Sequence, residues 1–124
     1  MATVTLTKDN FEEVVAGSEI ALVDFWAEWC GPCKKFGPIF EDVSGQHDDI
    51  AFGKIDTEDQ QELARSFGIM SIPTLMIFRD QIVVFSQPGM LPAEALDDLI
   101  AQVRALDMDE VRRAIAEQEE PASR

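Results

Sequence analysis

The amino-acid sequence predicts an α/β domain in which helices cover both faces of a mixed β-sheet. Residues 20–26 are apolar on both faces apart from Asp24, as expected for a strand that is buried on both sides. Strand and helix patterns then follow one another in the order βαβαβα and ββα, which is typical of a layered α/β domain. Only Asp80 and Gln81 separate the last two strands, so this pair must be antiparallel and the sheet mixed.

Local patterns place the elements along the chain. The predicted strands are residues 3–6, 20–26, 50–55, 74–78 and 82–85, the first of them at an edge. Apolar residues at helical spacing predict helices over residues 11–16, 32–45 and 92–106. Asn10 is expected to cap the first of these helices, and Pro38 is expected to kink the second. Residues 57–60 match a capping box, which predicts a further helix that runs to about residue 67 and ends at Gly68.

Residues 107–124 form a predicted extension to a main domain of residues 1–106. Asp107 and Glu110 predict a helix start, and Met108, Val111 and Ile115 then fall on one side, with Ala114. A helix of about a dozen residues is marginal alone in water, so this apolar side needs a partner surface. We expect it to dock beside the helix of residues 92–106. A contact with a partner or second copy and a frayed tail are the alternatives, and residues 119–124 are expected to fray.

Composition limits the function. The chain has 124 residues, enough for one domain, and 24 acidic against 10 basic residues give a net charge of −14. This negative charge argues against nucleic acid and anionic membranes as partners. It is expected either to keep the protein soluble or to attract partner proteins with basic surfaces. No apolar run is long enough to span a membrane, and residues 1–8 lack the layout of a signal peptide, so a cytoplasmic protein is expected.

The segment Cys30-Gly31-Pro32-Cys33 lies where a strand gives way to a helix. Pro32 suits the first turn of a helix, and the unpaired N–H groups at a helix N-terminus favour a thiolate over a thiol. A thiolate is the nucleophile of disulfide exchange, and Cys33 is close enough to close a small ring with Cys30. The segment is therefore predicted to be a redox dithiol. Zinc is excluded in a monomer, because His47 is the only histidine and two cysteines are too few ligands.

Three features in this order resemble the thioredoxin family. The segment Trp29-Cys30-Gly31-Pro32-Cys33 follows a strand that carries Asp24. The segment Ser71-Ile72-Pro73-Thr74 opens a later strand and matches the family's cis-proline loop, and Gly89 lies between the last strand and the next helix. The resemblance covers residues 3 to 106 and implies a thioredoxin fold: a central mixed five-stranded sheet flanked by helices, here with an extra C-terminal helix.

The resemblance also assigns roles to residues. Cys30 is the attacking nucleophile, Cys33 is the more buried, resolving thiol, and the two form the Cys30–Cys33 disulfide, with Gly31 and Pro32 between them. The backbone of Ile72, before a cis Pro73, is expected to pair with an extended substrate strand. Exposed apolar patches usually bind something, and the expected substrate-binding rim comprises Trp29, Gly31, Ile72, Pro73, Gly89 and Met90.

Asp24 is expected to be a buried carboxyl of raised pKa, because its strand neighbours are apolar. Such a group can remove the thiol proton of Cys33 as a general base; the alternative is a purely structural aspartate. The lysine that many family members carry near this aspartate is replaced by Phe52, and Lys54 follows two residues later. Trp26, Met70 and Met76 are expected to fill the core, and His47 is expected to lie in a solvated loop.

The predicted function is that of a protein disulfide reductase without a cofactor of its own. The resemblance implies disulfide-containing client proteins and recharging by an NADPH-fed thioredoxin reductase, with a monomer expected. An oxidant or isomerase of the same fold is disfavoured by the Gly31-Pro32 pair. The alternative from another class is a binding module whose groove docks a partner and whose dithiol is a redox switch.

Overall fold

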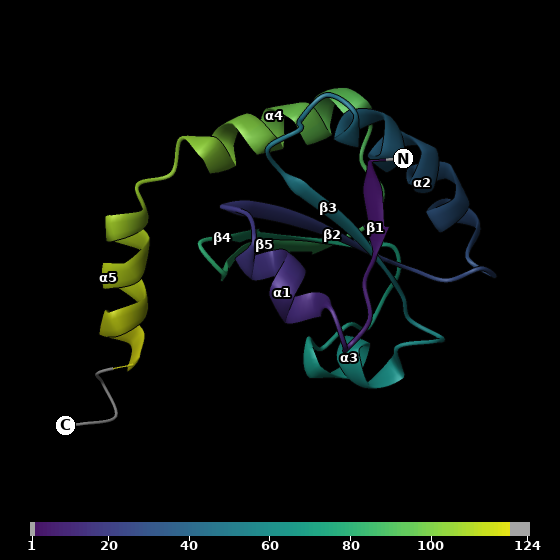
Figure 1. Cartoon of the computed structure of the whole chain (residues 1–124), viewed down its shortest axis with the longest axis horizontal. Helices are drawn as coiled ribbons and strands as arrows, with labels where there is room; N and C mark the ends of the chain where they lie inside the picture. The colour runs from purple at the N-terminus through teal and green to yellow at the C-terminus, as the bar shows by residue number, and fades with distance from the viewer. Residues whose placement is uncertain (1, 120–124) are drawn as a thin grey trace.

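Five strands form a single mixed sheet in the computed structural model, which describes residues 2–119 (Figure 1). The strands are β1 (Thr3–Thr5), β2 (Ile20–Trp26), β3 (Ala51–Asp56), β4 (Thr74–Arg79) and β5 (Ile82–Pro88). Their order across the sheet is β1-β3-β2-β4-β5, with β1 and β5 at the edges. Strands β1, β3 and β2 are parallel, while β4 is antiparallel to both β2 and β5. The mixed sheet and its edge strand β1 are thus confirmed.

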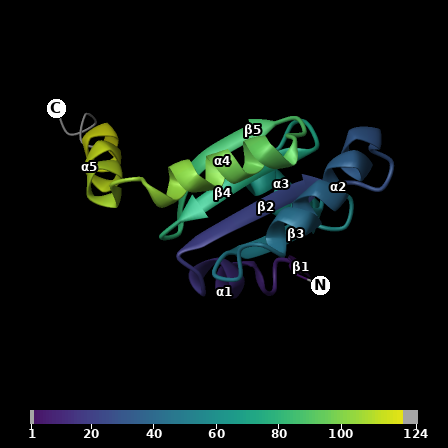
Figure 2. The same cartoon turned by 90° about the horizontal axis from the view of Figure 1, so that it is seen from above.

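Four helices cover the two faces of this sheet, and a fifth follows the end of the fourth (Figures 1 and 2). They are α1 (Phe11–Ala16), α2 (Gly31–Ser44), α3 (Gln61–Ser66), α4 (Ala93–Arg104) and α5 (Met108–Glu119). Buried residues of α2 and α4 pack on one face of the sheet, and residues of α1 and α3 pack on the other. Among residues 2–119, no helix is both long and apolar enough to cross a membrane.

The central strand β2 contributes to both hydrophobic cores because its side chains alternate between the faces. Leu22 packs with Phe36 and Phe40 of α2, whereas Val23 and Phe25 pack toward α1 and α3. All of β2 up to Phe25 is buried, as the sequence predicts. A strand buried on both faces is rigid, and it positions the loop that leads from Trp26 into α2.

Two predicted caps are wrong. The Asn10 side chain does not cap α1; its Oδ1 accepts from the Thr7 N–H at 2.7 Å and its Nδ2 donates to the Thr5 carbonyl at 3.0 Å. The capping box at 57–60 does not form, because α3 begins only at Gln61 and has no side-chain cap. Thr57 Oγ1 donates instead to the carbonyl of Trp26 at 3.1 Å. Both side chains hold neighbouring loops to the sheet rather than starting helices.

His47 is not a solvated loop residue. Its ring lies against Phe52, its Nε2 is 3.1 Å from Asp97 Oδ1, and its Nδ1 is 3.3 Å from the Arg104 guanidinium. Arg104 also forms a two-bond pair with Asp49 at 2.8 and 3.0 Å, which holds the pKa of that carboxyl down at about 2. This cluster ties the loop before β3 to α4.

The extension forms a helix, and its predicted cap is confirmed. Asp107 Oδ1 accepts from the N–H groups of Asp109 at 3.0 Å and Glu110 at 3.3 Å. Helix α5 does not lie beside α4 as expected; it leads away from the end of α4 (Figure 2). Its apolar side nevertheless faces its own domain, because Val111 and Ile115 line a pocket together with Val83 of β5. The helix is held there by the buried Met108 and by Arg112, which pairs with Asp80 of the β4–β5 turn at 2.8 Å. Glu119 ends this helix, and the rest of the predicted frayed tail lies outside the described residues.

Candidate active site

Cys30 occupies the N-cap position of α2, directly after the strand β2 and its short loop. Its sulfur accepts from the N–H of Cys33 at 3.2 Å, and its own carbonyl accepts from Lys34 at 3.2 Å. Pro32 lies in the first turn, where it forgoes no helical hydrogen bond. The sulfur of Cys30 therefore faces the positive end of a 14-residue helix, which favours the thiolate.

Cys30 and Cys33 are joined by a disulfide, with their Cα atoms 5.2 Å apart. Their exposed fractions are 4% and 3%, so burial hardly distinguishes the two residues in this oxidised form. What distinguishes them is position, since Cys30 precedes the helix and Cys33 lies within its first turn.

The loop before β4 lies opposite Cys30. The carbonyl oxygen of Ile72 is 3.7 Å from Cys30 Sγ, and the Ile72–Pro73 peptide bond is cis. The carbonyl of Pro73 in turn accepts from the Gly89 N–H at 2.8 Å. Gly89 has φ +104°, a conformation that side-chain-bearing residues rarely adopt. These contacts bring together the segments 29–33, 72–73 and 89–90, which are far apart in the sequence.

An apolar rim surrounds the disulfide. Trp29 is 69% exposed and Met90 is 39% exposed, while Ile72 is half-buried. Ile72 makes no backbone–backbone hydrogen bond with any residue of the described range 2–119. Its N–H group therefore has no backbone partner in this range, and its carbonyl oxygen lies next to the sulfur of Cys30.

Asp24 is completely buried on β2, on the same face of the strand as Leu22 and Trp26. Neither carboxyl oxygen has a hydrogen-bond partner among the described protein groups. Burial raises the pKa of Asp24 to about 7, and the positive charge of Lys54 opposes this rise only in part. The prediction of a buried carboxyl with a raised pKa is confirmed. At neutral pH such a group can either take up or release a proton.

Lys54, and not residue 52, is the lysine near Asp24. The register of β2 and β3 pairs Asp24 with Lys54, whereas Phe52 is paired with Leu22 and buried in the core. The Lys54 ammonium lies 5.2 Å from the centre of the Trp26 ring, within range of a cation–π interaction. Trp26 is accordingly half-buried rather than a core residue. Trp26, Cys33 and Lys54 line one surface pocket, and Asp24 does not line it.

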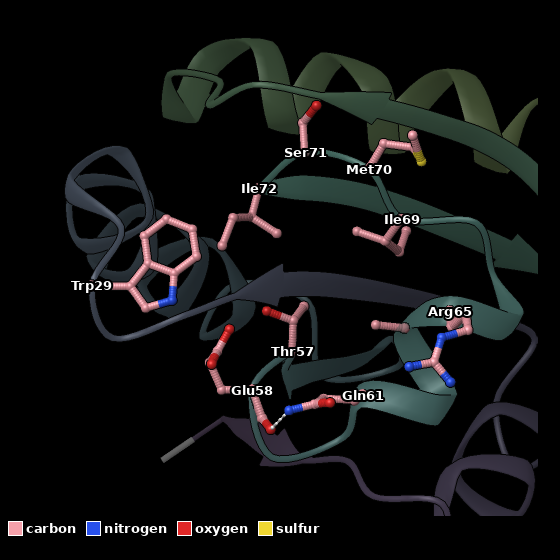
Figure 3. A pocket seen from close by; sticks show the side chains of 10 residues that line it. Trp29, Thr57, Glu58, Gln61, Arg65, Ile69, Met70, Ser71 and Ile72 are labelled. Carbon is pink, nitrogen blue, oxygen red and sulfur yellow. Dashed lines mark hydrogen bonds between the residues drawn. The ribbon is translucent and has the colours of Figure 1, made fainter.

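A second pocket beside Trp29 and Ile72 was not anticipated from the sequence (Figure 3). Several of its lining residues come from the loop before α3 and from α3 itself. The sequence pattern of residues 57–60 predicts a helix cap, so these residues were not expected to form part of a pocket. Met70 also lines it and is 93% exposed, so the prediction that it fills the core is wrong; Met76, at 3%, does fill it. Among residues 2–119, no three potential metal-ligating side chains cluster.

Comparison with known proteins gives a consistent result. The family described as Thioredoxin matches residues 2–102. "Putative thioredoxin 2" of Streptomyces coelicolor is 60% identical over 121 residues, which cover 98% of this chain and 90% of that protein. The thioredoxin of Bacillus subtilis is 41% identical over 101 residues, 81% of this chain and 96% of that protein.

Solved structures agree with this comparison. A mutant thioredoxin from Halobacterium salinarum superposes with a TM-score of 0.79 at 33% identity, covering 85% of this chain and 93% of that one. Plasmodium falciparum thioredoxin superposes with a TM-score of 0.74 at 31% identity, covering 81% of this chain and 98% of that one. Helix α5, at residues 108–119, lies beyond the residues that the family matches.

Proposed function

The chain belongs to the thioredoxin family, and on that basis we propose which of its residues carries out each step of disulfide reduction. The protein is a thiol–disulfide oxidoreductase that reduces disulfides by dithiol–disulfide exchange through Cys30 and Cys33. We assign the attack on the substrate to Cys30 and the release of the product to Cys33. The observation that carries this assignment is the hydrogen bond from the Cys33 N–H to Cys30 Sγ at the start of α2. The binding-module alternative is not favoured, since the redox dithiol is the feature shared with the family.

The reaction proceeds in two exchanges. The Cys30 thiolate attacks one sulfur of the substrate disulfide, and the other substrate sulfur leaves as a thiolate that takes up a proton. Cys33 then loses its proton and attacks Cys30 Sγ in the mixed disulfide, which expels the second substrate thiolate. The Cys30–Cys33 disulfide closes, so two electrons have moved from the dithiol to the substrate.

Asp24 is proposed to accept the Cys33 proton in the second exchange. Support comes from its burial, its pKa of about 7 and the absence of a competing hydrogen-bond partner among residues 2–119. A base whose pKa lies near the working pH is effective because it is both available and able to accept the proton. A carboxylate with an ordinary pKa would be a weaker base for a thiol.

The substrate segment is proposed to lie as an extended strand against Ile72. Support comes from the lack of a backbone partner for Ile72 within residues 2–119 and from the 3.7 Å distance between its carbonyl oxygen and Cys30 Sγ. Trp29, Gly31, Pro73, Gly89 and Met90 would form the surrounding rim. Backbone pairing of this kind accepts many sequences, which suits a reductase of several clients.

The partners are proposed to be disulfide-containing client proteins and an NADPH-fed thioredoxin reductase, with the protein acting as a monomer in the cytoplasm. The net charge of −14 supports the exclusion of nucleic acid and anionic membranes. We further propose that residues 1–106 form the catalytic domain and 107–124 an extension. In support of this division, the family match ends at residue 102.

Alkylation of the reduced protein tests the roles of the cysteines. Near neutral pH, iodoacetamide should modify Cys30 much faster than Cys33, as measured by mass spectrometry of the peptides at short reaction times. Equal rates, or faster modification of Cys33, would overturn the assignment. Cys33→Ser should in addition accumulate mixed disulfides with its clients, whereas Cys30→Ser should not; this matched pair also identifies the clients.

A further inference from the structure

The pocket beside the redox centre has a volume of about 540 Å³ and is continuous with the catalytic rim. Trp29 and Ile72 belong to both, so a chain that lies on Ile72 has this pocket immediately next to it. Figure 3 shows Trp29 at one end of the pocket and Arg65 at the other, with Ile72 and Ile69 between them. The pocket therefore leads away from Cys30 toward the end of α3.

The lining of the pocket is apolar in its middle and charged at two places. Ile69, Ile72 and Ala64 supply apolar surface, whereas Glu58 lies near Trp29 and Arg65 lies at the far end (Figure 3). Gln61 donates to the Glu58 carbonyl at 3.1 Å, which holds the loop against α3. An apolar side chain fits the middle of such a pocket, and a polar group fits its far end.

Among the described residues, Arg65 is the one cation that lines this pocket, in a molecule with a net charge of −14. Its side chain is exposed, and it takes part in none of the ion pairs within residues 2–119. Arg79, Arg104 and Arg112 are by contrast each paired with a carboxylate. An unpaired arginine at the end of a pocket favours a carboxylate from a bound molecule, because a guanidinium donates to carboxylate oxygens in a fixed fork.

We propose that this pocket is a client-recognition subsite in which Arg65 selects an acidic side chain near the reacting cysteine of the client. The proposal rests on the proposed placement of the client strand along Ile72. The client places an apolar side chain against Ile69 and Ile72, and a carboxylate further along reaches Arg65. The overall acidic surface repels acidic segments, so this one cation gives clients a preferred sequence and orientation.

The alternation of side chains along an extended strand sharpens the expectation. Successive side chains of a strand point to opposite sides, so only every second residue of the client can enter the pocket. An acidic residue should therefore help at one position on one side of the cysteine, and it should not help at the two adjacent positions.

Peptides with one cysteine in a mixed disulfide with thionitrobenzoate provide the test. Attack on the peptide sulfur releases the coloured thiolate, which is the better leaving group because of its low pKa. Glutamate or glutamine is placed in turn at each position near the cysteine, on both sides. At one position glutamate should raise the second-order rate constant of the reduced protein over glutamine by about two- to five-fold, the size expected of an exposed ion pair.

The preference should disappear in Arg65→Gln and reverse toward lysine in Arg65→Glu. Arg113→Gln is the matched control, because it removes an exposed cation of α5 without touching the pocket, and it should keep the preference. A preference that survives Arg65→Gln, or equal rates at every position, overturns the subsite. Reduction of the thionitrobenzoate dimer, which carries no peptide, is measured for each variant. Failure of that reaction in the unmodified protein would contradict the proposed function instead.

Discussion

Asp24 and Lys54 are register partners on the parallel strands β2 and β3, yet no hydrogen bond or ion pair joins them in the described chain. The Lys54 ammonium is placed over the ring of Trp26 instead. Its charge lowers the pKa of Asp24 without cancelling the larger effect of burial, and that pKa remains at about 7. The balance between these two effects sets the pH at which Asp24 can act as a base.

Replacing Asp24 by Asn should stabilise the fold at neutral and alkaline pH. The pKa of Asp24 is about 7 in the folded protein and 3.8 in the reference state, so the folded protein binds more protons between these values. Stability is therefore lost as pH rises through this range, and the loss is complete above the folded pKa. The loss is on the order of 4 kcal/mol at 1.36 kcal/mol per pKa unit. Urea unfolding measures the free energy of unfolding of both proteins. The unmodified protein and Asp24→Asn should be equally stable at pH 4, and Asp24→Asn should be the more stable of the two at pH 8.

The same substitution should slow the resolution of the mixed disulfide. Asn cannot accept the Cys33 proton, so release of the client should become slower and should lose the dependence on pH near 7 that a titrating base confers. Single-turnover release of a labelled peptide between pH 6 and pH 9 measures this step. If the rate and its pH profile match those of the unmodified protein, Asp24 is structural.

Replacing Lys54 by Met should move the pH profile without removing the base. Loss of the nearby positive charge raises the pKa of Asp24 further, and the rise in resolution rate should shift to higher pH. Lys35→Met is the control, because Lys35 is an exposed residue of α2 that does not line the pocket of Lys54. A shift to lower pH, or an equal shift in both variants, would contradict the coupling between Lys54 and Asp24.

Gln81 should be a site at which glycine stabilises the protein. Asp80 and Gln81 have φ of 53° and 67°, so the two-residue β4–β5 turn requires the left-handed conformation twice. Gln81→Gly should raise the free energy of unfolding by about 1 kcal/mol, because a side chain in this conformation is strained. Gln81→Ala, which keeps a Cβ, should bring little or no gain. Thermal unfolding of the three proteins distinguishes these outcomes.

Ending the chain after Leu106 should leave the reduction of insulin nearly unchanged, since none of the assigned catalytic or rim residues lies in α5. Stability should fall by about 1 to 3 kcal/mol, because truncation removes the buried Met108 and the Arg112–Asp80 ion pair. Met108→Ala in the full chain should reproduce most of this loss. A truncated protein that is folded but inactive would instead place α5 in the active site or its partner surface.

Features that depend on residues close together in the chain could be predicted from the sequence alone. The two-sided burial of β2, the dithiol at the start of α2, the antiparallel β4–β5 pair and the Asp107 cap each follow from residues within a few positions of one another. Capping motifs were less reliable. The side chains of Asn10 and Thr57 donate to the carbonyl groups of Thr5 and Trp26 instead of capping a helix. A short polar side chain can hydrogen-bond to several nearby backbone groups, and the tertiary fold determines which of them is within reach.

Contacts between distant segments could not be predicted in the same way, because they depend on how the elements pack. The register of β2 and β3 brought Lys54 opposite Asp24, and the loop before β4 brought Ile72 to Cys30. The exposure of Met70 and the pocket that ends at Arg65 depend on how α3 packs beside that loop. Helix α5 was predictable as a helix, but its place beyond the end of α4 was not. An apolar stripe indicates that a helix needs a partner surface, whereas the position of that surface depends on contacts between residues far apart in the chain.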